Sequence, residues 1–132
     1  MGKREERERL LRALYSIDIL GDYGESSVRQ FAEKNGWDQI TVDKLLAIAA
    51  KRVTIDESIA QNLKGWTVPR IAVVDRSVLR LAVYELAYEQ QTPMKVVISE
   101  AIEMAKKYGA KDSFQFVNAV LDAIARQIGR SV

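Results

Sequence analysis

The sequence predicts an all-α protein, a compact helical bundle, on three observations. Apolar residues recur at helical spacing through most of the 132 residues. No segment alternates apolar and polar residues over the length that a half-buried strand needs. The seven glycines and two prolines leave few places for turns, and a 48% hydrophobic share provides enough apolar residues for one folded core. We therefore expect long helices and short loops in a single domain of residues 1–132.

The amino-terminal half, about residues 1–65, is predicted to contain three helices. Each is followed by a glycine, which suits the left-handed position after a helix. The helices cover about residues 3–20, 27–35 and 38–64, and the glycines are Gly21, Gly36 and Gly65. The third helix is unusually long, so a bend or break is expected near Thr54.

The carboxy-terminal half, about residues 66–132, is also predicted to contain three helices. Its first helix is expected to begin at Pro69, because proline is tolerated in a first helical turn. The three helices cover about residues 69–91, 96–108 and 113–128, the last of them opened by Asp112 or Ser113. The helix at 69–91 is apolar on almost every side, which places it in the middle of the bundle.

The composition excludes several kinds of chemistry. Cysteine and histidine are both absent, which removes disulfides, thiolate or imidazole metal sites, and Cys-His or Ser-His catalysis. The sequence also lacks a glycine-rich phosphate loop and a GxSxG motif. We expect no enzyme, no cofactor and no metal. Without an apolar leader or an apolar run of roughly 18 residues, a soluble cytoplasmic protein outside the membrane is expected.

The net charge of +2 is too small to attract a polyanion over a distance, so binding to nucleic acid would need a local basic patch. The first predicted helix offers one. Its apolar stripe is replaced in the first two turns by Lys3, Arg4 and Arg7. Such a start would project beyond the domain edge and contact phosphates. The alternative is a solvated first turn balanced by the neighbouring glutamates, and the spacing alone favours this alternative.

Charged and aromatic side chains elsewhere have two interpretations. Arg76 and Arg80 are predicted to pair with acids of neighbouring helices, whereas Asp75 fits either such a pair or a contact with a basic partner. Aromatic residues beside polar stretches can stack on single-stranded bases or pack between helices. Packing is the prediction for any one of them alone, and more firmly for Trp66, Tyr84 and Tyr88.

Four strings in this order resemble the NusB family of bacterial transcription antitermination factors. They are RALY at 12–15, VVDRSVLRLAVYEL at 73–86, PMKVVISEAIEMAKKYG at 93–109 and DSFQFVNAVLD at 112–122. The resemblance implies an all-helical fold of two three-helix halves and a role without catalysis. It also implies pairing with NusE, a small-subunit ribosomal protein, and binding to single-stranded boxA RNA of nascent transcripts, notably in ribosomal RNA operons. RNA polymerase with other Nus factors would complete the complex.

The resemblance also implies roles for particular residues. RNA contacts fall on Lys3, Arg4, Arg7, Tyr15 and Phe116, and partner contacts on Asp75 and Asp112. Because glutamates dilute the basic start, we expect weak RNA binding by this chain alone and tighter binding with NusE. Self-association of the free protein as a homodimer is compatible with the sequence. The alternative function is a ribosome-assembly or protein-interaction adaptor in which RNA contact is secondary.

Overall fold

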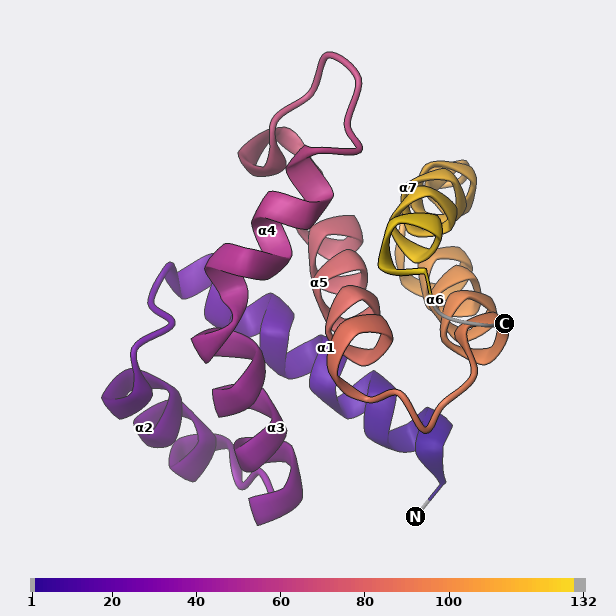
Figure 1. Cartoon of the computed structure of the whole chain (residues 1–132). Coiled ribbons are helices and arrows are strands. Elements are labelled where there is room, and N and C mark those ends of the chain that lie inside the picture. Colours follow the sequence, from indigo (N-terminus) through magenta and orange to yellow (C-terminus); the bar gives the residue numbers. More distant parts are fainter. Residues whose placement is uncertain (1, 130–132) are drawn as a thin grey trace.

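The computed structural model describes residues 2–129 of the chain, and this part is helical throughout, with no strand among the described residues (Figure 1). The elements in order are α1 (Lys3–Leu20), α2 (Glu25–Asn35), α3 (Gln39–Ala50), α4 (Arg52–Ala60), the short 3₁₀ turn η1 (Val68–Arg70), α5 (Val73–Tyr88), α6 (Met94–Tyr108) and α7 (Ser113–Ile128). The prediction of an all-α fold is confirmed. Gly21 and Gly36 adopt the expected left-handed conformation after α1 and α2, with φ of 73° and 66°.

The segment predicted as one helix at 38–64 is two helices, so four helices rather than three precede α5. The break falls at Lys51 and not near Thr54. The backbone N–H of Lys51 is shared between the carbonyl oxygens of Ala47 and Ile48, at 3.2 and 3.1 Å, which tightens the last turn of α3. The break lets α3 pack on α1 and α2, while α4 packs on α5, η1 and α7. One straight helix would not reach both sets of neighbours.

The prediction that the next helix begins at Pro69 is wrong. Pro69 lies in η1, and α5 begins at Val73. The physical reason is the side chain of Arg76, whose Nη1 donates to the carbonyl oxygens of Pro69 and Ile71 at 3.1 and 3.2 Å. These bonds hold η1 as a separate turn, because the same carbonyl oxygens cannot at once point along a continuous helix.

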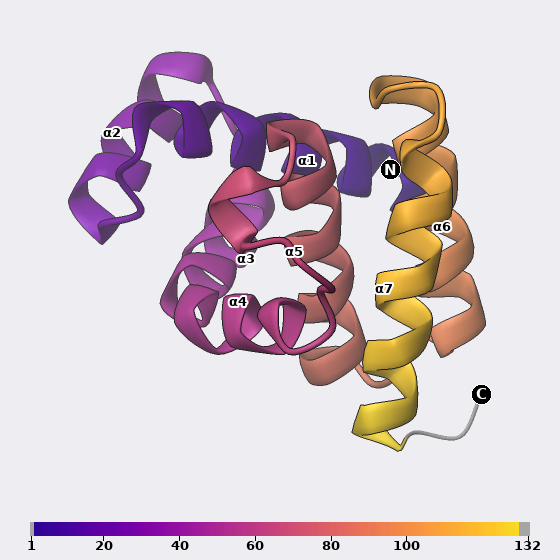
Figure 2. The same cartoon turned by 90° about the horizontal axis from the view of Figure 1, so that it is seen from above.

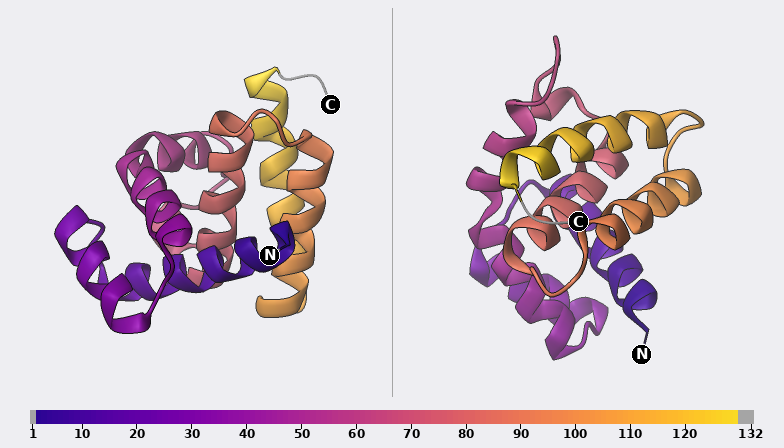
Figure 3. Two further views of the ribbon diagram at one scale, coloured as in Figure 1. Left: turned by 90° about the horizontal axis from the view of Figure 1, so that it is seen from below. Right: turned by 45° about the vertical axis from the view of Figure 1, so that its right-hand side comes forward.

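Helix α5 lies at the centre of the bundle, as its sequence predicts. It packs against α1, α6 and α7 and also contacts α3 and α4 (Figure 2). Its fully buried apolar side chains include Val78, Leu79, Leu81 and Leu86. Helices α6 and α7 form an antiparallel pair on one side of α5, and α1 to α4 occupy the other side (Figure 3). The start of α1 reaches across to α6, so residues from the two halves of the chain lie together there.

The two arginines of α5 are paired, as predicted. Arg80 donates to Asp56 of α4 at 2.8 and 2.9 Å and to Asp18 of α1 at 2.9 Å. Arg76 donates to the same Asp18, with its Nε at 2.9 Å from Oδ2. Both guanidinium groups are therefore paired with carboxylates inside the bundle and do not form a basic surface.

The prediction of packing for Trp66 is wrong, since 55% of its surface is exposed. Tyr88 is exposed on one side, but its ring packs against that of Tyr84, with centroids 5.4 Å apart. Trp66 stands in the loop between α4 and η1, which few helices flank, and Tyr88 lies in the last turn of α5, where the bundle ends. Tyr84, one turn earlier, packs against the core as expected.

Candidate nucleic-acid interface

Lys3 and Arg4 lie in the first turn of α1 and are exposed, as expected of a helix start at the domain edge. The side chain of Arg4 is 70% exposed, yet it is paired. Its Nε and Nη2 donate to Glu100 of α6 at 3.2 and 3.1 Å. Such an exposed pair contributes little to stability, so Arg4 can exchange this carboxylate for a phosphate at small cost.

Arg7 does not project from the domain, which differs from the prediction of a projecting basic start. It is only 5% exposed, and its Nη2 and Nε donate to the two carboxylate oxygens of Glu85 in α5 at 2.8 and 2.9 Å. Its Nη1 also lies 3.8 Å from Glu100, the acid that holds Arg4. The face of α1 that carries its apolar residues and Arg7 lies against α5. At Arg7 the buried carboxylate of Glu85 pairs with the guanidinium group.

Two lysines near the end of α6 stand beside this helix start. Lys106 and Lys107 line, with Arg4, a groove of about 360 Å³ between α1 and α6. Lys107 is exposed and donates to Glu8 at 2.8 Å. Lys106 is exposed and lies over the ring of Phe114, 4.9 Å from its centroid. Sequence reasoning missed both lysines, because a basic last turn is also what the helix dipole favours.

Tyr15 lies on the same edge, one turn further along α1 than Arg12. It is exposed and lines a shallow cavity of about 370 Å³ together with Arg12 and Tyr108. The ring of Tyr108 lies between two cations, 6.0 Å from the guanidinium of Arg12 and 5.2 Å from Nζ of Lys107. Single-stranded bases stack on open aromatic faces beside cations that contact the phosphates, and the exposed ring of Tyr15 offers such a face.

Phe116 is half-buried on α7 and packs against the core. It therefore offers at most part of its ring to a ligand. Phe114, two residues earlier, is likewise half-buried and is the ring that Lys106 covers. The resemblance assigns RNA contact to Phe116 alone, and the structure places Phe114 and Phe116 on the same helix with similar burial.

Asp75 lies in the first turn of α5 and is buried, with 7% of its surface exposed. Its Oδ1 accepts no hydrogen bond from any described residue. Burial raises the pKa of this carboxyl group, and the hydroxyl group of Ser113 lowers it in part. An acceptor without a donor is costly unless something else supplies one. Neither arginine of α5 pairs with it, so of the two alternatives for Asp75 the internal ion pair is not found among the described residues.

Asp112 is exposed and precedes α7 at the N-cap position, but its side chain makes no capping hydrogen bond within the described chain. Ser113 Oγ instead accepts from the backbone N–H of Ala110 at 3.1 Å. This bond shapes the loop between α6 and α7 next to Asp75. The loop between α6 and α7 therefore lies next to the start of α5. The exposed carboxylate of Asp112 does not cap α7.

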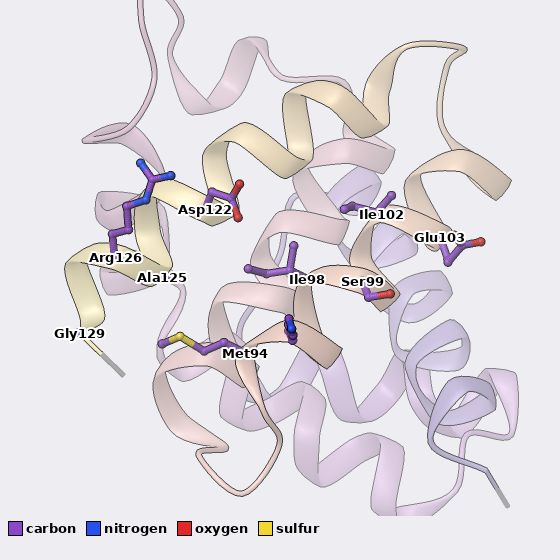
Figure 4. A pocket seen from close by; sticks show the side chains of 10 residues that line it. Met94, Ile98, Ser99, Ile102, Glu103, Asp122, Ala125, Arg126 and Gly129 are labelled. Atoms are coloured by element: carbon purple, nitrogen blue, oxygen red, sulfur yellow. The ribbon is translucent and has the colours of Figure 1, made fainter. Parts of the chain in front are cut away.

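A second groove, of about 580 Å³, lies between the start of α6 and the end of α7 (Figure 4). Its lining includes apolar side chains together with both charge signs, among them Met94, Ile98, Ile102, Asp122, Ala125 and Arg126. It is not part of the basic edge. Within residues 2–129 no cluster of acidic side chains is arranged to hold a metal ion. None of the helices in this part of the chain has both the length and the apolar character needed to cross a membrane.

The arrangement of helices agrees with the family that the sequence resembles. A family model described as the NusB family matches residues 4–126. The chain belongs to the NusB family. It is 41% identical over 129 residues to the transcription antitermination protein NusB of Bacillus thuringiensis (strain Al Hakam), covering 94% of this chain and 97% of that protein.

Solved structures of the NusB family have the same fold. T. maritima NusB superposes with a TM-score of 0.81 at 34% identity, covering 96% of this chain and 92% of that one. A chain in the crystal structure of the antitermination factors NusB and NusE in complex with double-stranded RNA superposes with a TM-score of 0.75, covering 95% of this chain and 96% of that one. At 23% identity this second likeness supports the fold alone.

Proposed function

We propose that this NusB-family chain is a transcription antitermination factor, without catalytic activity, that binds single-stranded RNA and pairs with NusE. The observation that carries the RNA part is the edge formed by α1 and α6. There Arg4, Lys106 and Lys107 line a groove in which Glu8, Glu100 and Glu103 also lie, and Tyr15 and Tyr108 line the neighbouring cavity. Cations for phosphates and rings for bases are the two elements of single-strand recognition. Acting on nascent transcripts, the protein would work in the cytoplasm.

Within this site the three basic residues at the start of α1 have different roles. Lys3 and Arg4 are exposed and would contact phosphates directly. Arg7 is enclosed by Glu85 and approaches Glu100, so it would act as a positioning residue that holds the first turns of α1 against α5 and α6. RNA binding would then depend on Arg7 through the placement of Arg4.

The partner contacts fall next to this edge. Asp75 Oδ1 is a buried acceptor without a donor, and the cavity of Tyr15 and Tyr108 also includes Val74, the residue before it. A basic partner such as NusE would supply the missing donor. Asp112, exposed at the neighbouring loop, would offer a second acidic contact. RNA and partner would then lie side by side, so that each adds to the retention of the other.

Titration of labelled single-stranded RNA of the boxA type tests this function. The complex with NusE should bind RNA more tightly than the chain alone, and Lys106→Gln with Lys107→Gln should weaken the binding and reduce its salt dependence. Lys34→Gln is the matched control, because Lys34 is exposed on the distant α2. Equal RNA affinity with and without NusE, or an equal effect of the control, would refute the proposal.

A role as an adaptor in ribosome assembly, with secondary RNA contact, makes the opposite prediction. Arg4→Gln would then leave the affinity of the ternary complex for RNA unchanged. Under the proposed function Arg4→Gln weakens this affinity while the pairing with NusE stays intact, because Arg4 lies on the α6 side and Asp75 lies at the start of α5.

A further inference from the structure

Trp66 is an exposed aromatic residue that the proposed RNA edge does not include. It lies in the loop between α4 and η1, directly after Gly65, whose φ of +76° turns the chain outward. This loop and the start of α1 lie at opposite ends of the molecule in Figure 1 and in the right view of Figure 3. More than half of the surface of Trp66 is open to solvent. A large ring in this position buries little surface on folding, so Trp66 contributes little to the stability of the fold. Stability therefore does not explain why a tryptophan stands here.

The ring of Trp66 is held in place by a cation. The guanidinium carbon of Arg70 lies 5.5 Å from the ring centroid. Arg70 belongs to η1, and Arg76 fixes this turn by donating to two of its neighbouring carbonyl oxygens. Asp18 in turn holds Arg76. The backbone that carries Arg70 is therefore fixed before any ligand arrives, which keeps Arg70 within reach of the ring of Trp66.

The surroundings of Trp66 favour a nucleic acid over a protein. The segment 61–72 contains Lys64 and Arg70 and no acidic residue. An aromatic hot spot for a protein partner needs a rim of neighbours that excludes water. The neighbouring exposed residues, from Lys64 to Thr67, include no second large apolar side chain that could form such a rim. Stacking of a base needs only one open ring face, with cations nearby for the phosphates.

We infer that Trp66 and Arg70 form a second contact for single-stranded RNA, one that holds nucleotides outside those bound at the α1–α6 edge. This inference rests on the proposed function, because the same RNA chain would engage both places. One ring face of Trp66 stacks on a base, and Arg70 with Lys64 contacts the adjoining phosphates. The RNA then needs to be long enough to reach from the edge to the loop.

Tryptophan fluorescence measures this contact directly. The chain has two tryptophans, and the other, Trp37, packs against Phe31 with ring centroids 5.2 Å apart. In the Trp37→Phe variant the emission therefore reports Trp66 alone. Oligo(U) should quench this emission in a saturable way, whereas poly-glutamate, which has the charge without bases, should not. Quenching by poly-glutamate to the same extent would assign the loop to acidic peptides and overturn the inference.

Affinity against RNA length separates the inference from the proposed function. With oligo(U) of increasing length, Trp66→Ala should weaken the binding of long members about fivefold or more and leave short members unchanged. Trp66→Phe should retain the affinity of wild type, and Val53→Ala, at another exposed apolar residue, should have no effect. Arg4→Gln should weaken binding at every length. If Arg4→Gln acts and Trp66→Ala does not at any length, the inference alone fails. If the unmodified chain with NusE binds neither oligo(U) nor boxA-type RNA, the proposed function fails with it.

Discussion

The guanidinium group of Arg7 and the carboxylate of Glu85 form a two-point ion pair inside the bundle, with N–O distances of 2.8 and 2.9 Å. Both residues are almost fully buried, at 5% and 6% exposure. A buried pair of this kind is costly to break on one side, because the remaining charge keeps its desolvation penalty without its partner. The start of α1 is therefore fixed to α5 by charge as well as by its leucines.

Removing either member of this pair should destabilise the protein strongly. Arg7→Leu and Glu85→Leu should each lower the free energy of unfolding by about 3–5 kcal/mol, and the double variant should lose much less than their sum. Urea denaturation followed by circular dichroism measures all three. Arg4→Gln is the control and should leave the free energy of unfolding almost unchanged, because its pair with Glu100 is exposed. Additive losses in the double variant would show that the pair is not coupled.

Protonation of Asp18 should destabilise the folded protein at acid pH. Burial alone would raise the pKa of Asp18, but hydrogen bonds from Arg76, Tyr23 and Arg80 bring it below its ordinary value. The stabilisation from Asp18 is thus complete above pH 3.8, its ordinary pKa, and is lost as the pH falls through the lower pKa of the folded state. Asp18→Asn should cost about 3 kcal/mol at pH 7.

The measurement for Asp18 is the free energy of unfolding of wild type and Asp18→Asn from pH 7 down to pH 2. The two curves should converge below pH 3.8, where the folded wild type also binds the proton. Asp43→Asn is a suitable control, since Asp43 is exposed on α3. A constant gap at all pH values would contradict the assignment of the effect to this carboxylate.

Asp75 should behave in the opposite way. Burial raises the pKa of this carboxyl group, so its ionised form destabilises the folded state more as the pH rises from the ordinary value through the raised one. Asp75→Asn should therefore stabilise the free protein at pH 7 by about 1 kcal/mol, the scale of a buried acceptor without a donor. The gain should vanish below pH 3.8. Thermal unfolding of both proteins at pH 7 and pH 3 tests this, and a loss of stability at pH 7 would contradict it.

Gly109 should tolerate no side chain. A Cβ atom there would lie 2.7 Å from the backbone oxygen of Ala105 and 3.0 Å from Asp75 Oδ1. The backbone φ of −91° is open to any residue, so the restriction is one of space. Gly109→Ala should lower the free energy of unfolding by about 1–3 kcal/mol. Gly2→Ala, where a Cβ meets nothing within 4 Å, is the control and should leave stability unchanged in the same urea titration.

Sequence periodicity was sufficient for most of the fold. The helix ends at Gly21 and Gly36 follow from local backbone preference, and the central place of α5 follows from its apolar faces. The sequence predicts a break in this segment but places it near Thr54 and not at Lys51, because the position of the break depends on which neighbours α3 and α4 reach. The false helix start at Pro69 has the same kind of cause, since a distant arginine side chain fixes the turn.

The candidate site was less predictable for an electrostatic reason. Arg4 and Arg7 look alike in the sequence, and only the positions of Glu85 and Glu100 on other helices make one exposed and the other buried. Trp66 lies between two predicted helices and Tyr84 lies within one, but an apolar ring alone does not tell which of the two is exposed. Pairings between residues almost 80 positions apart in the chain are outside the reach of periodicity.

The charges that join α1 and α5 also specify the direction in which the two helices meet. Arg7 near the start of α1 pairs with Glu85 near the end of α5, while Asp18 at the end of α1 pairs with Arg76 and Arg80 nearer the start of α5. An acid in a last turn opposes the dipole of its own helix by about 0.3–1 kcal/mol, so local helix stability does not favour it. Turning α1 around would place like charges together at both ends. The apolar stripes would permit either orientation, and the charges allow one.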